Sequence, residues 1–80
     1  METTVREVLA AHAGLVKDAM TIDAESDLFA AGMTSHASVN VMLALEDELD
    51  IEFPERLLKK STFASIAAIL DALEQLAPVA

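Results

Sequence analysis

Apolar residues recur every three or four positions along most of the chain, which is the spacing of amphipathic helices. The first such stretch carries an apolar stripe that consists of Val5, Val8, Leu9, His12, Leu15 and Val16. Thr4 followed by Glu7 has the form of a capping box. We therefore predict a first helix from about Thr4 to Lys17 or Ala19. His12 is interpreted as a hydrogen-bonded residue at the boundary of the core.

The second helical stretch holds more apolar residues than one helix face needs, and we predict that it runs from Thr34 or Ser35 to about Leu49. Positions 38, 41, 42, 45 and 49 form one stripe. A second stripe consists of Ser35, Val39, Leu43 and Glu46. If the first stripe enters the core, Val39 and Leu43 are partly exposed on the same side as Ser35.

Between these two stretches, residues 20–33 lose the helical spacing and contain residues that favour turns. We interpret this segment as a long loop, which in a domain of this size is often functional. Its apolar side chains, which we expect to fix it to the core, are Ile22, Leu28 and Phe29.

Pro54 suits a loop or the first turn of a short helix that runs to about Lys60. Ser61 or Thr62 is predicted to cap a last helix that carries Phe63 and the apolar residues up to Leu76, and Pro78 to end it. The predicted fold is all-α. It is a compact four-helix bundle, formed by one domain over residues 1–80, with three main helices, a short third helix and a long loop between the first two.

Composition narrows the classes of function. The net charge is −9, and the stretch from Asp18 to Glu55 holds ten carboxylates and no Lys or Arg. Such a charge repels nucleic acids and favours encounters with basic protein surfaces, although it could also serve only to keep the protein in solution. No cysteine is available for a disulfide or a thiolate site. With no signal peptide and no apolar run of about 20 residues, we expect a soluble, cytoplasmic protein. We also expect a monomer.

Ser35 is the strongest candidate for chemistry, and two interpretations of it are open. A serine at a helix start, shortly after Gly32, is most often a cap or a first-turn residue. Alternatively, Thr34 takes the cap and leaves Ser35 exposed for modification. Free N–H groups and the helix dipole would then stabilise a phosphate attached there.

Three motifs of the chain stand at specific spacings: the stretch DLFAAGMTSH at 27–36, the stretch LEDELDIEFP at 45–54 and Ser61-Thr62-Phe63 before the last helix. With these motifs the sequence resembles the acyl carrier protein family. The family pattern is D-L-F-x-x-G-x-D-S-L, followed by an apolar helix that ends in L-E-E-x-F-x-I-x-I-P. The match covers nearly the whole chain, and the combination of motifs at these spacings is fairly specific.

The resemblance implies a carrier rather than an enzyme. A phosphopantetheinyl transferase would move 4'-phosphopantetheine from coenzyme A to Ser35. The thiol of the arm would hold an acyl or aminoacyl group as a thioester for a downstream transfer enzyme. The residues expected to contact partner enzymes are Thr34, His36, Val39, Asn40, Leu43, Glu46 and Asp47.

Two departures from the family pattern indicate a subgroup. Thr34 replaces the Asp before the serine, which contributes to transferase recognition in the family, and His36 replaces the Leu after it. Asn40 stands where the family often has an acidic residue. The variant T-S-H is similar to bacterial carrier proteins that are charged with amino acids. Their ligases resemble truncated seryl-tRNA synthetases.

The residues themselves argue against catalysis and against a metal site. Ser35 and His36 are adjacent on a helix and point about 100° apart, so they cannot readily form a nucleophile–base pair. The acidic run at 46–52 lacks the central glycine of an EF-hand loop. The alternative function is an unmodified, acidic helical module that binds a protein partner through its exposed apolar side chains.

Overall fold

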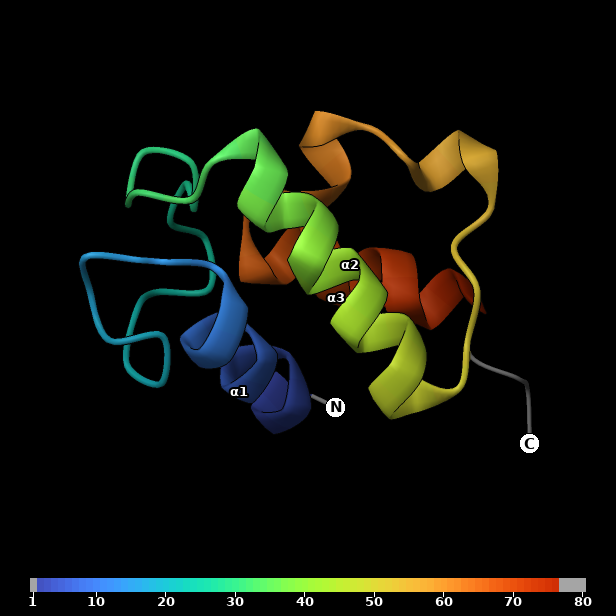
Figure 1. Ribbon diagram of the computed structural model, residues 1–80, viewed down its shortest axis with the longest axis horizontal. Coiled ribbons are helices and arrows are strands. Elements are labelled where there is room, and N and C mark those ends of the chain that lie inside the picture. The colour runs from blue at the N-terminus through green and yellow to red at the C-terminus, as the bar shows by residue number, and fades with distance from the viewer. Residues whose placement is uncertain (1, 77–80) are drawn as a thin grey trace.

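The computed structural model describes residues 2–76, which form three α-helices and two short 3₁₀ helices (Figure 1). The helices are α1 (Glu2–His12), α2 (Ser35–Leu49), η1 (Glu55–Leu57), η2 (Lys60–Phe63) and α3 (Ile66–Leu76). No strand occurs in this part of the chain, which confirms the predicted all-α class. Helix η1 occupies the place of the predicted short third helix, and η2 lies where the last helix is predicted to begin. None of the described helices is long and apolar enough to cross a membrane.

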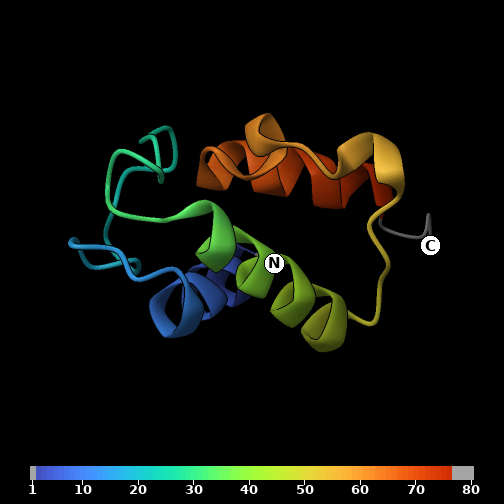
Figure 2. The same ribbon diagram turned by 45° about the horizontal axis from the view of Figure 1, so that its top comes forward.

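Helix α1 packs against both α2 and α3. Figure 2 shows α3 along the top of the view, with α1 and α2 beneath it. The loop from 13 to 34 lies at one end of the bundle, at the left of Figure 1, and leads directly into the start of α2. The first residue of α2 therefore lies where this loop meets the bundle.

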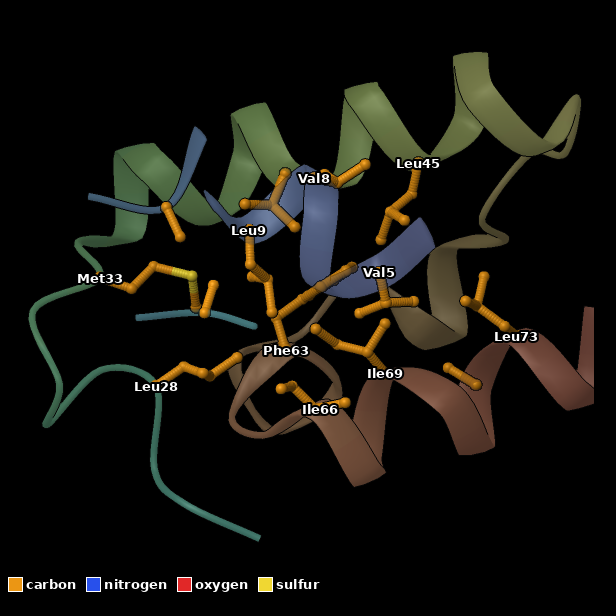
Figure 3. Packing of buried hydrophobic residues seen from close by; sticks show 14 of the residues in the cluster. Val5, Val8, Leu9, Leu28, Met33, Leu45, Phe63, Ile66, Ile69 and Leu73 are labelled. Carbon is orange, nitrogen blue, oxygen red and sulfur yellow. The ribbon is translucent and has the colours of Figure 1, made fainter. Parts of the chain in front are cut away.

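The core combines one face of each α-helix with apolar side chains from the loop and from η2 (Figure 3). Its largest fully buried side chains are Leu9, Leu28, Leu45, Ile66, Ile69, Leu73, Val5 and Val41. Phe53 and Phe63 add an edge-to-face pair with ring centroids 5.4 Å apart. Full burial of one such aliphatic side chain contributes about 1.5–3 kcal/mol. This set therefore provides most of the apolar stabilisation.

Helix α1 begins earlier and ends earlier than its apolar spacing predicts. It starts at Glu2, so Thr4 and Glu7 lie inside it and do not form a capping box. It ends at His12, and Gly14 then adopts a positive φ of 67°, which a residue with a side chain rarely adopts. Val16 donates a backbone hydrogen bond to the Ala31 carbonyl and is 83% exposed. The prediction that the helix continues to Lys17 or Ala19 is therefore wrong.

Long-range contacts fix the loop between α1 and α2. The Arg6 guanidinium donates to the carbonyls of Ala19 and Ile22, at 3.1 and 2.7 Å. The Leu28 N–H donates to the Ala64 carbonyl at 2.7 Å, and the Leu28 side chain is fully buried. Ile22 is also buried and Phe29 is half-buried, which confirms that these apolar residues hold the loop on the core.

The last helix begins later than predicted. Ser65, not Ser61 or Thr62, accepts a hydrogen bond from a backbone N–H of the first turn, that of Ala68, at 3.0 Å. Ser61 and Thr62 belong to η2, and so does Phe63. The Leu28–Ala64 bond connects this segment to the loop, a long-range contact that the local sequence does not indicate. Pro78, the predicted helix end, lies outside the described residues.

Candidate functional site

The start of α2 divides two roles between neighbouring residues. Thr34 has an extended backbone, and its hydroxyl oxygen accepts a hydrogen bond from the Ala37 N–H at 3.0 Å. This is the geometry of an N-cap, and it confirms that Thr34 takes the cap. Ser35 is the first helical residue and is exposed. Its hydroxyl is therefore not needed to cap the helix.

The backbone around Ser35 suits an attached phosphate. The N–H groups of Ser35 and His36 have no acceptor among the described residues, as expected in the first turn of a helix. The first turn contains no acidic side chain that would repel an anion. Together with the positive end of the helix dipole, these groups favour a negative charge at Ser35.

An apolar pocket of about 340 Å³ opens beside Ser35. It lies between the first half of α2, the loop and the segment that contains η2. Its lining consists of Phe29, Ser35, Ser38, Val39, Met42, Leu58, Lys59, Lys60 and Phe63. No carboxylate lines this pocket, although the chain as a whole is strongly acidic. The pocket thus offers apolar walls and positive charge next to the serine.

The exposed side of α2 bears most of the residues predicted to contact partners. Val39 and Leu43 are 49% and 52% exposed, whereas Val41 and Leu45 on the opposite side are fully buried. His36, Asn40 and Asp47 are also exposed, as is Thr34. The predicted division of α2 into a core stripe and an exposed apolar stripe is confirmed. We call the exposed surface formed by His36, Val39, Asn40, Leu43 and Asp47 the α2 ridge.

Glu46 differs from the other predicted partner residues because it has an intramolecular role. Its carboxylate accepts a hydrogen bond from the Phe53 N–H at 2.8 Å, and the residue is only half-exposed. The bond fixes the chain after α2, where Asp50 adopts a left-handed conformation with φ 52°. A partner contact by Glu46 stays a prediction.

A second hollow, of about 540 Å³, lies between α1 and α2 on the other side of the α2 ridge. Its lining consists of Thr4, Glu7, Val8, Ala11, His12, Asn40, Leu43, Ala44, Asp47 and Glu48. His12 is exposed here, so its interpretation as a hydrogen-bonded boundary residue is wrong. The α2 ridge therefore separates a lysine-lined pocket from an acidic hollow.

Sequence reasoning missed two groups of residues around the site. Arg6 holds the loop that leads to α2, and no local pattern in the sequence indicates this role. Lys59 and Lys60 reach the pocket beside Ser35, although they follow it by more than twenty positions. The pair is the only run of two basic residues in the chain, and this local concentration of positive charge is a sequence signal for a basic site.

These features together define a carrier domain: a small helical bundle that presents an unengaged serine hydroxyl at the head of a helix, beside an exposed recognition surface. The chain belongs to the family of proteins with a phosphopantetheine attachment site, whose pattern matches residues 3–73. It is a phosphopantetheine-dependent carrier protein, and members of this family carry substrates rather than catalyse reactions.

Known relatives agree with this assignment. An aminoacyl carrier protein of Agrobacterium fabrum is 49% identical over 74 residues, which cover 92% of this chain and 89% of that protein. The fold matches, with a TM-score of 0.89 and 49% identity, a carrier protein from Agrobacterium tumefaciens in complex with an engineered Bradyrhizobium japonicum glycine:[carrier protein] ligase and AMP. The match covers 92% of this chain and 99% of the other. A solution structure from Agrobacterium tumefaciens matches with a TM-score of 0.73 and 48% identity, over 94% and 90% of the two chains.

The residues present fit the prosthetic group that the family implies. Ser35 offers an exposed hydroxyl, and the first turn of α2 offers free N–H groups without a competing carboxylate. Phosphopantetheine supplies a terminal thiol, which holds a carried group as a thioester and which a chain without cysteine cannot supply itself. In such a carrier, the protein's own residues anchor the arm, stabilise its phosphate and present a surface to partners.

Proposed function

We propose that this protein is an aminoacyl carrier in which Ser35 bears the phosphopantetheine arm. The observation that carries the proposal is the arrangement at the start of α2. Thr34 caps the helix through a 3.0 Å hydrogen bond, and Ser35 next to it is exposed and not engaged as a cap. Ser38 is the nearest alternative in the pocket, but its hydroxyl donates to the Ser35 carbonyl at 2.6 Å.

The chemistry proposed at Ser35 is the attachment reaction that membership of this family implies. The hydroxyl oxygen forms a bond to the phosphorus next to the pantetheine of coenzyme A. The bond from that phosphorus to the adenosine half breaks, and the hydroxyl proton passes to the transferase. The product is a phosphodiester with one permanent negative charge, which the free N–H groups and the dipole of α2 stabilise. No residue of the carrier needs to act as acid or base.

The proposed loading enzyme is an amino acid:[carrier protein] ligase. The relative from Agrobacterium tumefaciens, crystallised with a glycine:[carrier protein] ligase, supports this class of partner. The sequence Thr34-Ser35-His36, similar to that of carriers charged with amino acids, supports it as well. We propose that the α2 ridge docks on such a ligase. A phosphopantetheinyl transferase and a downstream transfer enzyme complete the set of partners, and a monomeric, cytoplasmic state stays a prediction.

The attachment site is tested by intact-mass spectrometry after incubation with coenzyme A and a promiscuous transferase. We expect one phosphopantetheine-sized increment on the wild-type chain and on Ser38→Ala, and none on Ser35→Ala. Circular dichroism should show that both variants remain folded, because neither hydroxyl caps a helix. An increment that persists in Ser35→Ala would contradict the assignment.

Loading is tested with the holo-protein, ATP and a purified glycine:[carrier protein] ligase. We expect a further mass increment equal to one aminoacyl group, which hydroxylamine removes because it cleaves thioesters. Leu43→Ala should lower kcat/KM for loading about 5- to 30-fold, the range for loss of an interface contact worth about 1–2 kcal/mol. Val16→Ala is the matched control, since Val16 is an exposed valine that does not belong to the α2 ridge. An equal effect of both substitutions would argue against docking at the ridge.

A further inference from the structure

Two lysines bring positive charge to the site of an otherwise acidic protein. Lys59 and Lys60 line the same pocket as Ser35. The Lys60 ammonium lies over the ring of Phe29, with Nζ 4.9 Å from the ring centroid. This distance is within the range of a cation–π interaction, which favours one position of an otherwise mobile side chain. Phe29 itself lines the pocket, so the contact keeps the Lys60 charge at its rim.

Neither lysine is neutralised by a carboxylate. Over residues 2–76, the only ion pair joins Arg6 to Glu2, both in α1. No acidic side chain lines the pocket, and none lies in the first turn of α2. The hollow that Glu7, Asp47 and Glu48 line lies between α1 and α2 and shares no lining residue with this pocket. The two hollows therefore differ in sign of charge.

We infer that Lys59 and Lys60 form a counter-charge for the phosphodiester on Ser35 and thereby direct the arm over the apolar pocket. The inference rests on the proposed function, because it requires the arm to be attached at Ser35. An anion held at the head of α2 is attracted to the lysine side of the ridge and repelled from the carboxylates on the other side. The lysines do not touch the thioester, so they act as positioning residues.

In this arrangement the arm rests over the pocket, and partner enzymes can displace it from there. Because the lysines are exposed, their pairing with the phosphate is weak and depends on salt. A partner enzyme that brings its own cation to the phosphate would compete with Lys59 and Lys60 and free the arm. The contact is therefore expected to bias the position of the arm without holding it permanently.

The inference is tested by NMR on holo-protein whose two arm amides carry 15N. Mass spectrometry first establishes that the arm is on Ser35; a chain that accepts no arm there removes the proposed function and this inference together. We expect the arm amides to have higher order parameters at low salt than at high salt. We expect the double variant Lys59→Gln/Lys60→Gln to reduce the ratio of docked to free arm roughly two- to fivefold, the range for an exposed ion pair.

Two control variants separate the proposed contact from general effects of charge. Lys17→Gln removes an exposed lysine that does not line the pocket, and it should leave the arm unchanged. Lys60→Arg keeps the charge and its stacking on Phe29, and it should keep the order of the arm. Equal arm order in the wild type and in the double variant, with the arm on Ser35 in both, would overturn the inference while leaving the proposed function intact. A similar loss in Lys17→Gln would also overturn it.

Discussion

Arg6 is the side chain whose loss should most disturb the segment that leads to the serine. Its guanidinium donates to the carbonyls of Ala19 and Ile22, and its side chain is only 13% exposed. It also pairs with Glu2 at 2.9 Å, where the carboxylate side chain is 52% exposed. We predict that replacing Arg6 loosens the first half of the loop from α1 and lowers the free energy of unfolding.

The size of the effect follows from these contacts. A hydrogen bond from a charged donor contributes about 1.5–3 kcal/mol, so the two bonds set a ceiling of about 3–6 kcal/mol. Both bonds are part-buried, and relaxation of the loop that admits water to the freed carbonyls brings the expected loss below this ceiling, to about 2–3 kcal/mol. The pair with Glu2 adds less than about 0.5 kcal/mol because it is partly exposed. For a domain of this size, the melting temperature should fall by roughly 10–20 °C.

The assay is thermal and urea unfolding, followed by circular dichroism, of Arg6→Met and Arg6→Lys. Met keeps an apolar stem and removes both hydrogen bonds, whereas Lys keeps the charge without the forked donors, and should lose less stability. Glu2→Gln is the control and should cost less than about 0.5 kcal/mol. A melting temperature of Arg6→Met within about 2 °C of the wild type would refute the reasoning, since less than about 0.5 kcal/mol would then depend on the bonds.

Three further predictions concern α2 and are checked by the same unfolding measurements. Thr34→Ala should cost about 1 kcal/mol through loss of the cap, and Thr34→Ser almost nothing; equal costs would contradict the cap. Asp50→Gly should stabilise the protein by about 0.5–1 kcal/mol, because Asp50 has a φ of 52° and places a negative charge at the helix C-terminus. Asp50→Asn tests the charge alone, and a destabilised Gly variant would refute this reasoning. Leu45→Ala should cost about 2–5 kcal/mol, since Leu45 is fully buried, and a loss below about 1 kcal/mol would count against that burial.

The sequence predicts α2 well because the signals for this helix are local. Thr34 marks its start, and the apolar spacing distinguishes the buried Val41 and Leu45 from the exposed Val39 and Leu43. The local pattern leaves two interpretations of Ser35 open, and the structure agrees with the one in which Thr34 takes the cap and Ser35 is exposed. Attachment of the arm at that serine was suggested by the family motif and still requires the mass measurement proposed above.

The sequence does not predict the elements that depend on contacts between distant residues. The apolar spacing of α1 continues through Leu15 and Val16, but Val16 instead bonds to the Ala31 carbonyl across the loop. Gly32, with a φ of 117°, approaches Gly14 so closely that a side chain there would lie 3.2 Å from the Gly14 carbonyl oxygen. Such a contact between two loop ends has no periodic signal.

The same limit applies to the start of α3 and to part of the site. Ser61 and Thr62 are good capping residues, but they lie in a 3₁₀ helix, and the residue after it, Ala64, accepts a hydrogen bond from the distant Leu28. After α2 the chain returns toward the loop between α1 and α2, and this brings Lys60 to Phe29. The family motif therefore identifies the serine, whereas only the folded chain identifies its basic neighbours.

The hydrogen bond from Ala37 to Thr34 has a consequence for repeated use of the protein. The residue that secures the helix and the residue proposed to be modified are different, so esterification of Ser35 breaks no bond on which the bundle depends. The apo, holo and charged forms can therefore share one backbone, and the protein need not rearrange between successive enzymes. The rate at which the carrier is charged and discharged would then be set by the enzymes that bind it.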